Sequence, residues 1–117
     1  MLIRIKNLRL RTIIGVNEWE RTQAQEVVVN VEMEFDGTAA AGSDDLADTI
    51  DYKSLKRRIM ERVEASSFFL LEKLASEILR IVTAEPRVIR ATVEVDKPAA
   101  LRFADSVSVV CSGGRER

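Results

Sequence analysis

The alternation of apolar and polar side chains predicts four β-strands. The clearest covers residues 27–35, where every second residue is apolar and most of the residues between are polar. Residues 89–95 and 107–111 alternate in the same way. Residues 3–14 also look like a strand, but the apolar positions change parity after Asn7. A change of parity within a strand predicts a β-bulge or a bend at that point.

Between the second and third strands the apolar spacing changes to that of helices. Leu55, Ile59 and Val63 recur every four residues, as in a helix that buries one stripe. A second stripe begins at Leu71 and must end before Pro86, because the residue before a proline disfavours helical geometry. The pair Ser66–Ser67 separates the two helices.

The segments between these elements are predicted as loops. One follows Gly15 and includes Trp19 and Glu20, and another covers residues 41–48. Either Asp51 or Ser54 can cap the first helix. Residues 113–117 are small and charged and are predicted to fray.

The element order is ββααββ, which places the chain in the α+β class as a single domain over residues 1–117. Two helices can cover only one face of a four-stranded antiparallel sheet. An open sheet also leaves two edges, and joining neighbouring subunits edge to edge into a closed barrel would remove them. The uncovered polar face would then line a central channel. It carries Asn30, Glu32, Glu34, Arg90, Thr92 and Glu94.

Composition narrows the possible chemistry. The chain has 117 residues, no histidine and one cysteine, Cys111. It therefore lacks Ser/His and Cys/His nucleophile pairs and the clustered ligands of a zinc site. Cys111 is expected to be a small buried hydrophobe in a reducing compartment, and the N-terminus does not resemble a signal peptide, so a cytoplasmic protein is predicted.

Charge and hydropathy point away from nucleic acid and membranes. The net charge is −1, with 18 basic and 19 acidic side chains spread along the chain. Its apolar runs are too short to span a bilayer. The basic stretch Lys6, Arg9 and Arg11 is interpreted as a solvated strand face. The acidic residues before the first helix are interpreted as helix caps rather than as a metal site. They are Asp44, Asp45, Asp48 and Asp51.

Six segments follow a known pattern that extends over nearly the whole chain: Ile3-Arg4-Ile5-Lys6-Asn7-Leu8, Ile14-Gly15-Val16, Trp19-Glu20, Ile50-Asp51-Tyr52, Leu70-Leu71-Glu72-Lys73-Leu74 and Lys97-Pro98-Ala99. Together they resemble the dihydroneopterin aldolase family. Within that family, two regions are more similar to the branch that epimerises dihydroneopterin triphosphate: residues 7–12, and Asp96-Lys97 with residues 100–108.

The resemblance implies a tunnelling fold, in which ββααββ subunits form a tetrameric ring, often stacked as an octamer, with pterin sites between adjacent subunits. It implies an enzyme that acts on a small pterin substrate without a metal or cofactor. The expected reaction is epimerisation at C2' of 7,8-dihydroneopterin triphosphate by retro-aldol and aldol steps. Two alternatives remain: dihydroneopterin aldolase, which releases glycolaldehyde in folate biosynthesis, and a ring without activity that binds a pterin or a protein.

The resemblance assigns Lys97, Tyr52 and Glu20 to catalysis. Lys97 is the expected proton-transfer residue, and acting as a base would require burial or a neighbouring cation to lower its pKa. Tyr52 would hold the hydroxyls of the substrate or relay a proton, and Glu20 would orient a water or the polyol chain. Without the resemblance, Lys97 and Glu20 would be taken for solvated residues and Tyr52 for a half-buried aromatic.

The remaining site residues are assigned to substrate binding. Glu72 would accept paired N–H bonds from the pterin ring, although a carboxylate in a first helical turn can simply stabilise the helix dipole. Leu71 lies on the side of Glu72, whereas Ile50 and Asp51 would present backbone groups from the neighbouring subunit. Arg102 is the first candidate for the triphosphate tail, with Lys6, Arg9 and Arg11 as further candidates. A solvated Arg102, or one paired with Asp105, is the alternative.

Overall fold

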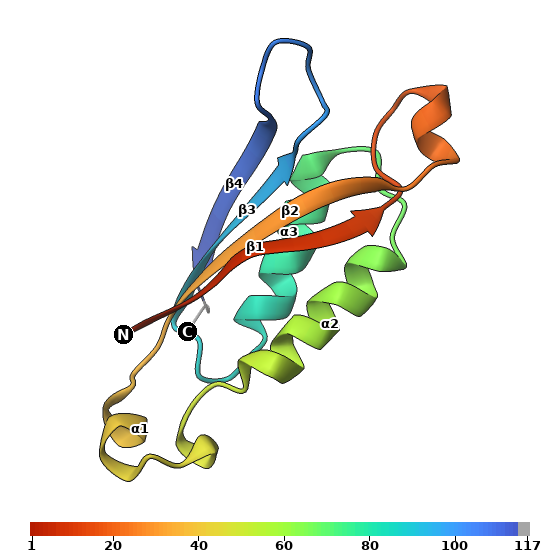
Figure 1. Ribbon diagram of the computed structural model, residues 1–117. Coiled ribbons are helices and arrows are strands. Elements are labelled where there is room, and N and C mark those ends of the chain that lie inside the picture. Colours follow the sequence, from red (N-terminus) through yellow and green to blue (C-terminus); the bar gives the residue numbers. More distant parts are fainter. Residues whose placement is uncertain (115–117) are drawn as a thin grey trace.

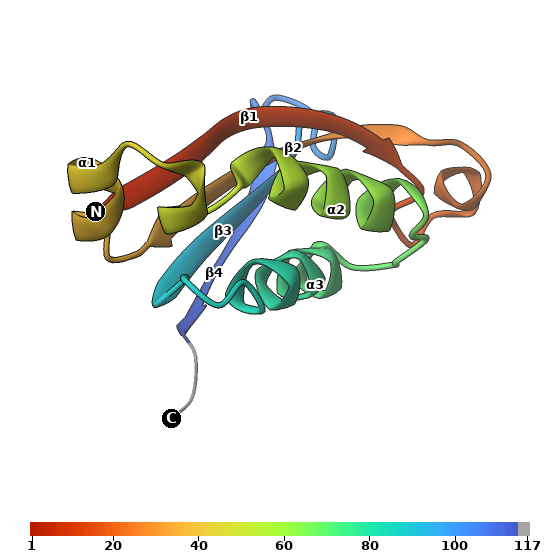
Figure 2. The same ribbon diagram turned by 90° about the horizontal axis from the view of Figure 1, so that it is seen from below.

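The structure, a computed structural model, describes residues 1–114, and residues 115–117 are left out of the description. Its strands form one antiparallel sheet in the order β1-β2-β3-β4 (Figure 1). The strands are β1 (Leu2–Thr12), β2 (Gln25–Glu34), β3 (Arg90–Lys97) and β4 (Val107–Gly114). The two long helices, α2 (Tyr52–Glu64) and α3 (Leu71–Thr83), lie side by side on one face of this sheet (Figure 2). The predicted ββααββ order and α+β class are confirmed.

The change of parity in the first strand is a β-bulge, as predicted. The register of β1 against β2 shifts between Ile5 and Leu8. Asn7 lies in the shift with a φ of 53°, and its backbone N–H donates to Oδ1 of Asn30 at 2.9 Å. Asparagine tolerates this left-handed conformation better than most residues do. The bulge keeps Ile5 and Leu8 on the covered face, where both pack against the core.

The core lies between the covered face of the sheet and the two helices. Val29, Val31 and Val93 of the central strands are buried against Leu55 and Ile78 of the helices. Burying an aliphatic side chain of this size contributes about 1.5 to 3 kcal/mol. The apolar residues of the predicted helical stripes and alternating strands therefore form the contacts that hold the layers together.

Short helices replace parts of the predicted loops. The prediction of a continuous loop over residues 41–48 is wrong, because α1 (Thr38–Ser43) extends into this region and η2 (Leu46–Asp48) lies within it. Three consecutive alanines, residues 39–41, favour a helical turn there. The loop after Gly15 contains a further 3-10 helix, η1 (Glu18–Arg21).

The interpretation of the acidic residues as caps is confirmed at two of them. Asp45 accepts a hydrogen bond from the backbone of Ala47 at 2.9 Å, and Asp51 accepts one from that of Ser54 at 3.1 Å. Asp51, and not Ser54, is therefore the cap of α2. Within residues 1–114, no group of three or more histidine, cysteine, aspartate or glutamate residues is placed to hold a metal ion.

The predicted frayed tail is wrong at its start. Gly113 and Gly114 belong to β4 and pair with Ala91 and Arg90 of β3. The rest of that predicted tail, residues 115–117, lies outside the described residues. Cys111 is half-buried in the same strand and packs against the core, and burial raises the pKa of its thiol.

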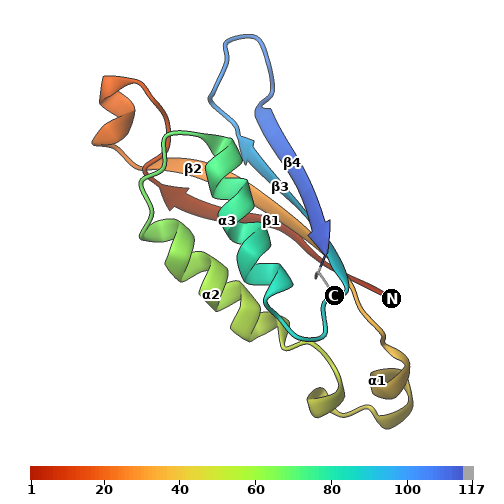
Figure 3. The same cartoon turned by 180° about the vertical axis from the view of Figure 1, so that it is seen from behind.

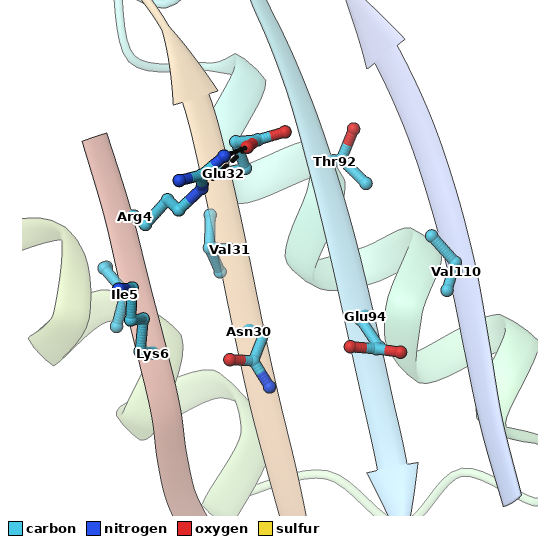
Figure 4. A pocket seen from close by; sticks show the side chains of 9 residues that line it. All are labelled: Arg4, Ile5, Lys6, Asn30, Val31, Glu32, Thr92, Glu94 and Val110. Carbon is cyan, nitrogen blue, oxygen red and sulfur yellow. Dashed lines mark hydrogen bonds and ion pairs between the residues drawn. The ribbon is translucent and has the colours of Figure 1, made fainter. Parts of the chain in front are cut away.

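The face of the sheet opposite the helices is polar, as predicted. Arg4 and Glu32 form an ion pair across β1 and β2 at 2.8 Å, and Thr92 and Glu94 continue the polar surface onto β3 (Figure 4). In the described chain, the outer edges of β1 and β4 pair with no other strand. Figure 3 shows these two strands as the margins of a strongly twisted sheet.

Candidate active site

A buried ion pair joins the end of β3 to the loop between β1 and β2. Lys97 is the last residue of β3, and its ammonium contacts Oε2 of Glu20 in η1. The side chains are only 13% and 3% exposed, respectively. The alternative of two solvated residues is therefore wrong for this pair. The structure also places a carboxylate, rather than a second cation, beside the lysine.

The carboxylate of Glu20 is held on both oxygens. Asn17 donates to Oε1 from its backbone at 3.1 Å and from Nδ2 at 2.8 Å, and Gln25 donates to Oε2 at 2.9 Å. Burial alone would raise the pKa of Glu20, but the hydrogen bonds from Lys97, Gln25 and Asn17 outweigh it and lower that pKa to about 2. Glu20 is therefore a fixed carboxylate at neutral pH.

Gly15 makes room for this carboxylate. Its φ is 126°, a conformation that L side chains rarely adopt, and a Cβ built there would lie 2.2 Å from Cδ of Glu20. The predicted loop start at Gly15 thus has a precise reason, since any side chain would displace the acid.

Arg21, which the sequence did not single out, fastens this loop to the connection between α2 and α3. Its guanidinium donates to the backbone oxygens of Gly15 at 2.9 Å and Phe68 at 3.1 Å, and also to that of Ser67. It lies 3.9 Å from the ring centroid of Phe69. These contacts join segments 46 and 47 residues apart, so no local pattern could have indicated them.

Leu71 and Glu72 lie at this same end of the subunit. They open α3, and Figures 1 and 3 both show the first turn of that helix beside the end of β3. Leu71 is half-buried and Glu72 is exposed. The structure therefore brings Lys97, Glu20, Leu71 and Glu72 to one region.

Ile50, Asp51 and Tyr52 lie at the opposite end. Ile50 and Asp51 precede α2, which begins at Tyr52, and this start of the helix is near α1 and η2 and far from the end of β3 in Figures 1 and 3. Ile50 is fully buried, whereas Tyr52 is 53% exposed. One chain thus does not assemble all the residues assigned to the site.

Arg102 lies in the loop between β3 and β4. It is exposed, and its guanidinium is 5.5 Å from the ring centroid of Phe103. In the part of the chain that the structure describes, it forms no ion pair with Asp105. Two of the further candidates are engaged within the sheet: Arg9 pairs with Glu26 at 3.4 Å, and Arg11 donates to the backbone of Ala24 at 2.8 Å.

The fold and the site together define the subunit of a tunnelling-fold enzyme. A crystal structure of Escherichia coli dihydroneopterin aldolase in complex with neopterin superimposes with a TM-score of 0.93 at 32% identity, covering 97% of this chain and 99% of that one. The model of the dihydroneopterin aldolase family, FolB, matches residues 3–112. The chain belongs to the dihydroneopterin aldolase family.

Two curated relatives separate the branches of that family. The chain is 44% identical to dihydroneopterin triphosphate 2'-epimerase of Escherichia coli K12, covering 97% of this chain and 95% of the relative. It is 33% identical to dihydroneopterin aldolase of the same strain, covering 97% of this chain and 93% of the relative. Both comparisons confirm the resemblance found in the sequence. No helix within residues 1–114 is long and apolar enough to cross a membrane.

Proposed function

We propose that this protein epimerises 7,8-dihydroneopterin triphosphate at C2', giving the 7,8-dihydromonapterin form. The observation that carries the proposal is the buried Lys97–Glu20 pair at the end of β3, in a chain that is 44% identical to an epimerase of this substrate. Those two residues supply an ammonium and a carboxylate within a region that also holds Glu72.

The chemistry needs no metal or cofactor from the protein. A ring C=N group of the dihydropterin lies next to the side-chain carbon, so breaking the C1'–C2' bond leaves a stabilised, enamine-like fragment. The enzyme must hold the ring and remove the proton of the 2'-hydroxyl as the bond breaks, and it must return that proton to the 2'-oxygen when the enamine carbon adds to the aldehyde again. Protonation of the enamine carbon instead would give the aldolase product. If the aldehyde fragment turns over before the bond forms again, C2' returns with inverted configuration.

Within this scheme Lys97 is the proton-transfer residue and Glu20 its positioning partner. Glu20 is fixed by Asn17, Gln25 and Lys97, so it holds the amine at the end of β3. It is also the acceptor next to which a water or the polyol chain can be oriented. Glu72 accepts N–H bonds from the pterin ring, and Leu71 contributes to the wall beside it.

Tyr52, Ile50 and Asp51 then come from a neighbouring subunit. Two facts support a shared site: Tyr52 lies far from Lys97 within one chain, and the edges of β1 and β4 lack partner strands in the described residues. Joining β1 of one subunit to β4 of the next closes a ring, which we propose is a tetramer that stacks as an octamer. We place it in the cytoplasm, consistent with the unpaired Cys111.

The triphosphate tail requires cations, and we assign Arg102 to it. An exposed guanidinium can form bidentate contacts with phosphate oxygens. Arg102→Ala should therefore lower turnover of the triphosphate more than that of unphosphorylated dihydroneopterin, and an equal loss for both would reject the assignment.

Aldolase activity is the second candidate, because the family model carries that name and the aldolase relative is 33% identical. The two reactions share the cleavage step and differ in whether the fragment is retained.

Product analysis tests the proposal. The purified protein is incubated with dihydroneopterin triphosphate and, separately, with dihydroneopterin, and products are resolved by chromatography. We expect the 2'-epimer of the triphosphate as the main product. Release of the glycolaldehyde-type fragment as the main product would make the protein an aldolase, and no product from either substrate would reject both.

A further inference from the structure

A hollow beside Tyr52 has the features of an anion site. It has a volume of about 330 Å³ and lies over the start of α2. Two cationic side chains, Lys53 and Arg57, line it together with Tyr52. The complete lining is Leu46, Asp51, Tyr52, Lys53, Ser54 and Arg57.

The two cations are arranged against the preference of the helix that carries them. Lys53 and Arg57 are four residues apart, so they lie on one face, where like charges repel. The first turn of α2 contains no acidic residue, although the positive end of the helix dipole favours one there. Asp51, before that turn, is engaged in capping the backbone of Ser54. Positive charge is thus concentrated at this hollow.

Other arginines of the helical layer are neutralised by carboxylates. Arg58 pairs with Glu85 at 3.6 Å, and Arg62 and Arg80 share Glu77 at 3.1 Å and 2.6 Å. Within residues 1–114, by contrast, Lys53 and Arg57 are exposed and form no ion pair. Their free charges fit a ligand with several anionic oxygens, because a guanidinium and an ammonium are the usual phosphate contacts.

We propose that Lys53 and Arg57 bind the triphosphate tail of a substrate held between two subunits, and that they do so from the subunit that supplies Tyr52. This inference rests on the proposed function, since only a shared site brings this hollow beside the Lys97 of a neighbour. It gives the tail contacts from both subunits: one binds the ring at Glu72 and contacts the tail through Arg102, and the other binds the tail through Lys53 and Arg57.

The test compares two substrates in the assembled enzyme. The double variant Lys53→Gln/Arg57→Gln is measured with dihydroneopterin triphosphate and with dihydroneopterin, and Lys56→Gln is the control, a lysine of the same helix outside the hollow. We expect the ratio of kcat/KM for the triphosphate to that for dihydroneopterin to fall about tenfold or more in the double variant. The control should keep the ratio of the natural chain. Circular dichroism and size-exclusion chromatography check that both variants fold and assemble.

Two outcomes would overturn the inference. One is a change in that ratio of less than about twofold, and the other is an equal change in Lys56→Gln. If the natural chain turns over neither substrate, the proposed function fails, and calorimetric titration with inorganic triphosphate tests the hollow alone. Binding that weakens about tenfold in the double variant would then support the site, whereas undetectable or equal binding would reject it.

Discussion

The end of the subunit that carries Lys97 is organised differently from the end that carries Tyr52. Around Lys97 and Glu20, polar groups are buried and every one of them has a partner: no buried side-chain nitrogen or oxygen in the described residues lacks a hydrogen bond. At the other end, Tyr52, Lys53 and Arg57 are exposed, and within residues 1–114 neither cation pairs with a carboxylate. One half of the proposed site is thus complete within a subunit, and the other half is exposed on its surface.

This difference fits the proposal that a chain of 117 residues builds its site between two subunits. The proposed proton-transfer residue, Lys97, needs a rigid environment, which β3, η1 and the contacts of Arg21 supply. The groups proposed to bind substrate at the Tyr52 end lie on the surface, where a neighbouring subunit would complete the site. The exposed apolar residues Trp19, Phe69 and Leu70 near the Lys97 end fit the same arrangement, since a neighbour would cover them.

The largest effect on activity is expected from removing the side-chain amine of Lys97. Lys97→Ala should lower kcat by about 10²- to 10⁴-fold, because proton transfer by a positioned group contributes that much. Steady-state kinetics give the value, and Lys56→Ala, on the exposed side of α2, is the control. A variant that keeps kcat within tenfold and remains folded by circular dichroism would show that the proton comes from elsewhere.

Mixing two inactive variants tests whether the two ends meet across an interface. Lys97→Ala and Tyr52→Ala are each expected to be nearly inactive as pure oligomers. When they are co-expressed in equal amounts, roughly a quarter of the sites in a ring should combine an intact Lys97 with an intact Tyr52 from the next subunit. Activity per site should recover to about that fraction. Mixed oligomers that stay inactive would place both residues in one subunit.

The sequence was sufficient for those features that depend on local pattern. The bulge at Asn7, the two helical stripes and the end of α3 before Pro86 all follow from spacing and from single-residue conformational preferences, and the structure contains each of them. The polar face of the sheet followed from the same alternation.

Features set by distant partners could not be predicted from pattern. Glu20 and Lys97 are 77 residues apart, so nothing near Glu20 indicates that it is buried. Gly113 and Gly114 have low strand propensity, but pairing with β3 extends the strand through them. Arg21 was missed for the same reason, since its contacts with Ser67, Phe68 and Phe69 reach the distant segment before α3.

The pH dependence of stability tests whether the buried carboxylate of Glu20 stabilises the fold. The pKa of Glu20 is lowered from 4.5 to about 2, so its contribution is complete above about pH 4.5 and is lost as the pH falls toward 2. Glu20→Gln should therefore cost on the order of 3 kcal/mol of unfolding free energy at pH 7, and much less at pH 2. Denaturant unfolding at a series of pH values measures this difference.

Glu77 is the matched control for that experiment. Hydrogen bonds from Arg80 and Arg62 lower its pKa to about 2 as well, but it lies on α3 away from the Lys97 end of the sheet. Glu77→Gln should show the same direction of pH dependence and retain activity, whereas Glu20→Gln should lose both stability and kcat. Equal retention of activity by the two variants would remove Glu20 from the site.

The smallest effect is expected at the Tyr52 end, where one cap orders the segment. The carboxylate of Asp51 accepts the backbone N–H of Ser54 at 3.1 Å, and removing such a cap costs about 1 kcal/mol. Asp51→Ala should lower the free energy of unfolding by that amount at neutral pH, as measured by urea titration, while Asp51→Asn should lose less because an amide oxygen still accepts. Asp51→Ala should also raise KM more than it lowers kcat, because Asp51 is assigned to binding and Lys97 keeps its own contacts. A fall in kcat at constant KM would mean that Asp51 serves the chemical step, and its assignment to binding would then be wrong.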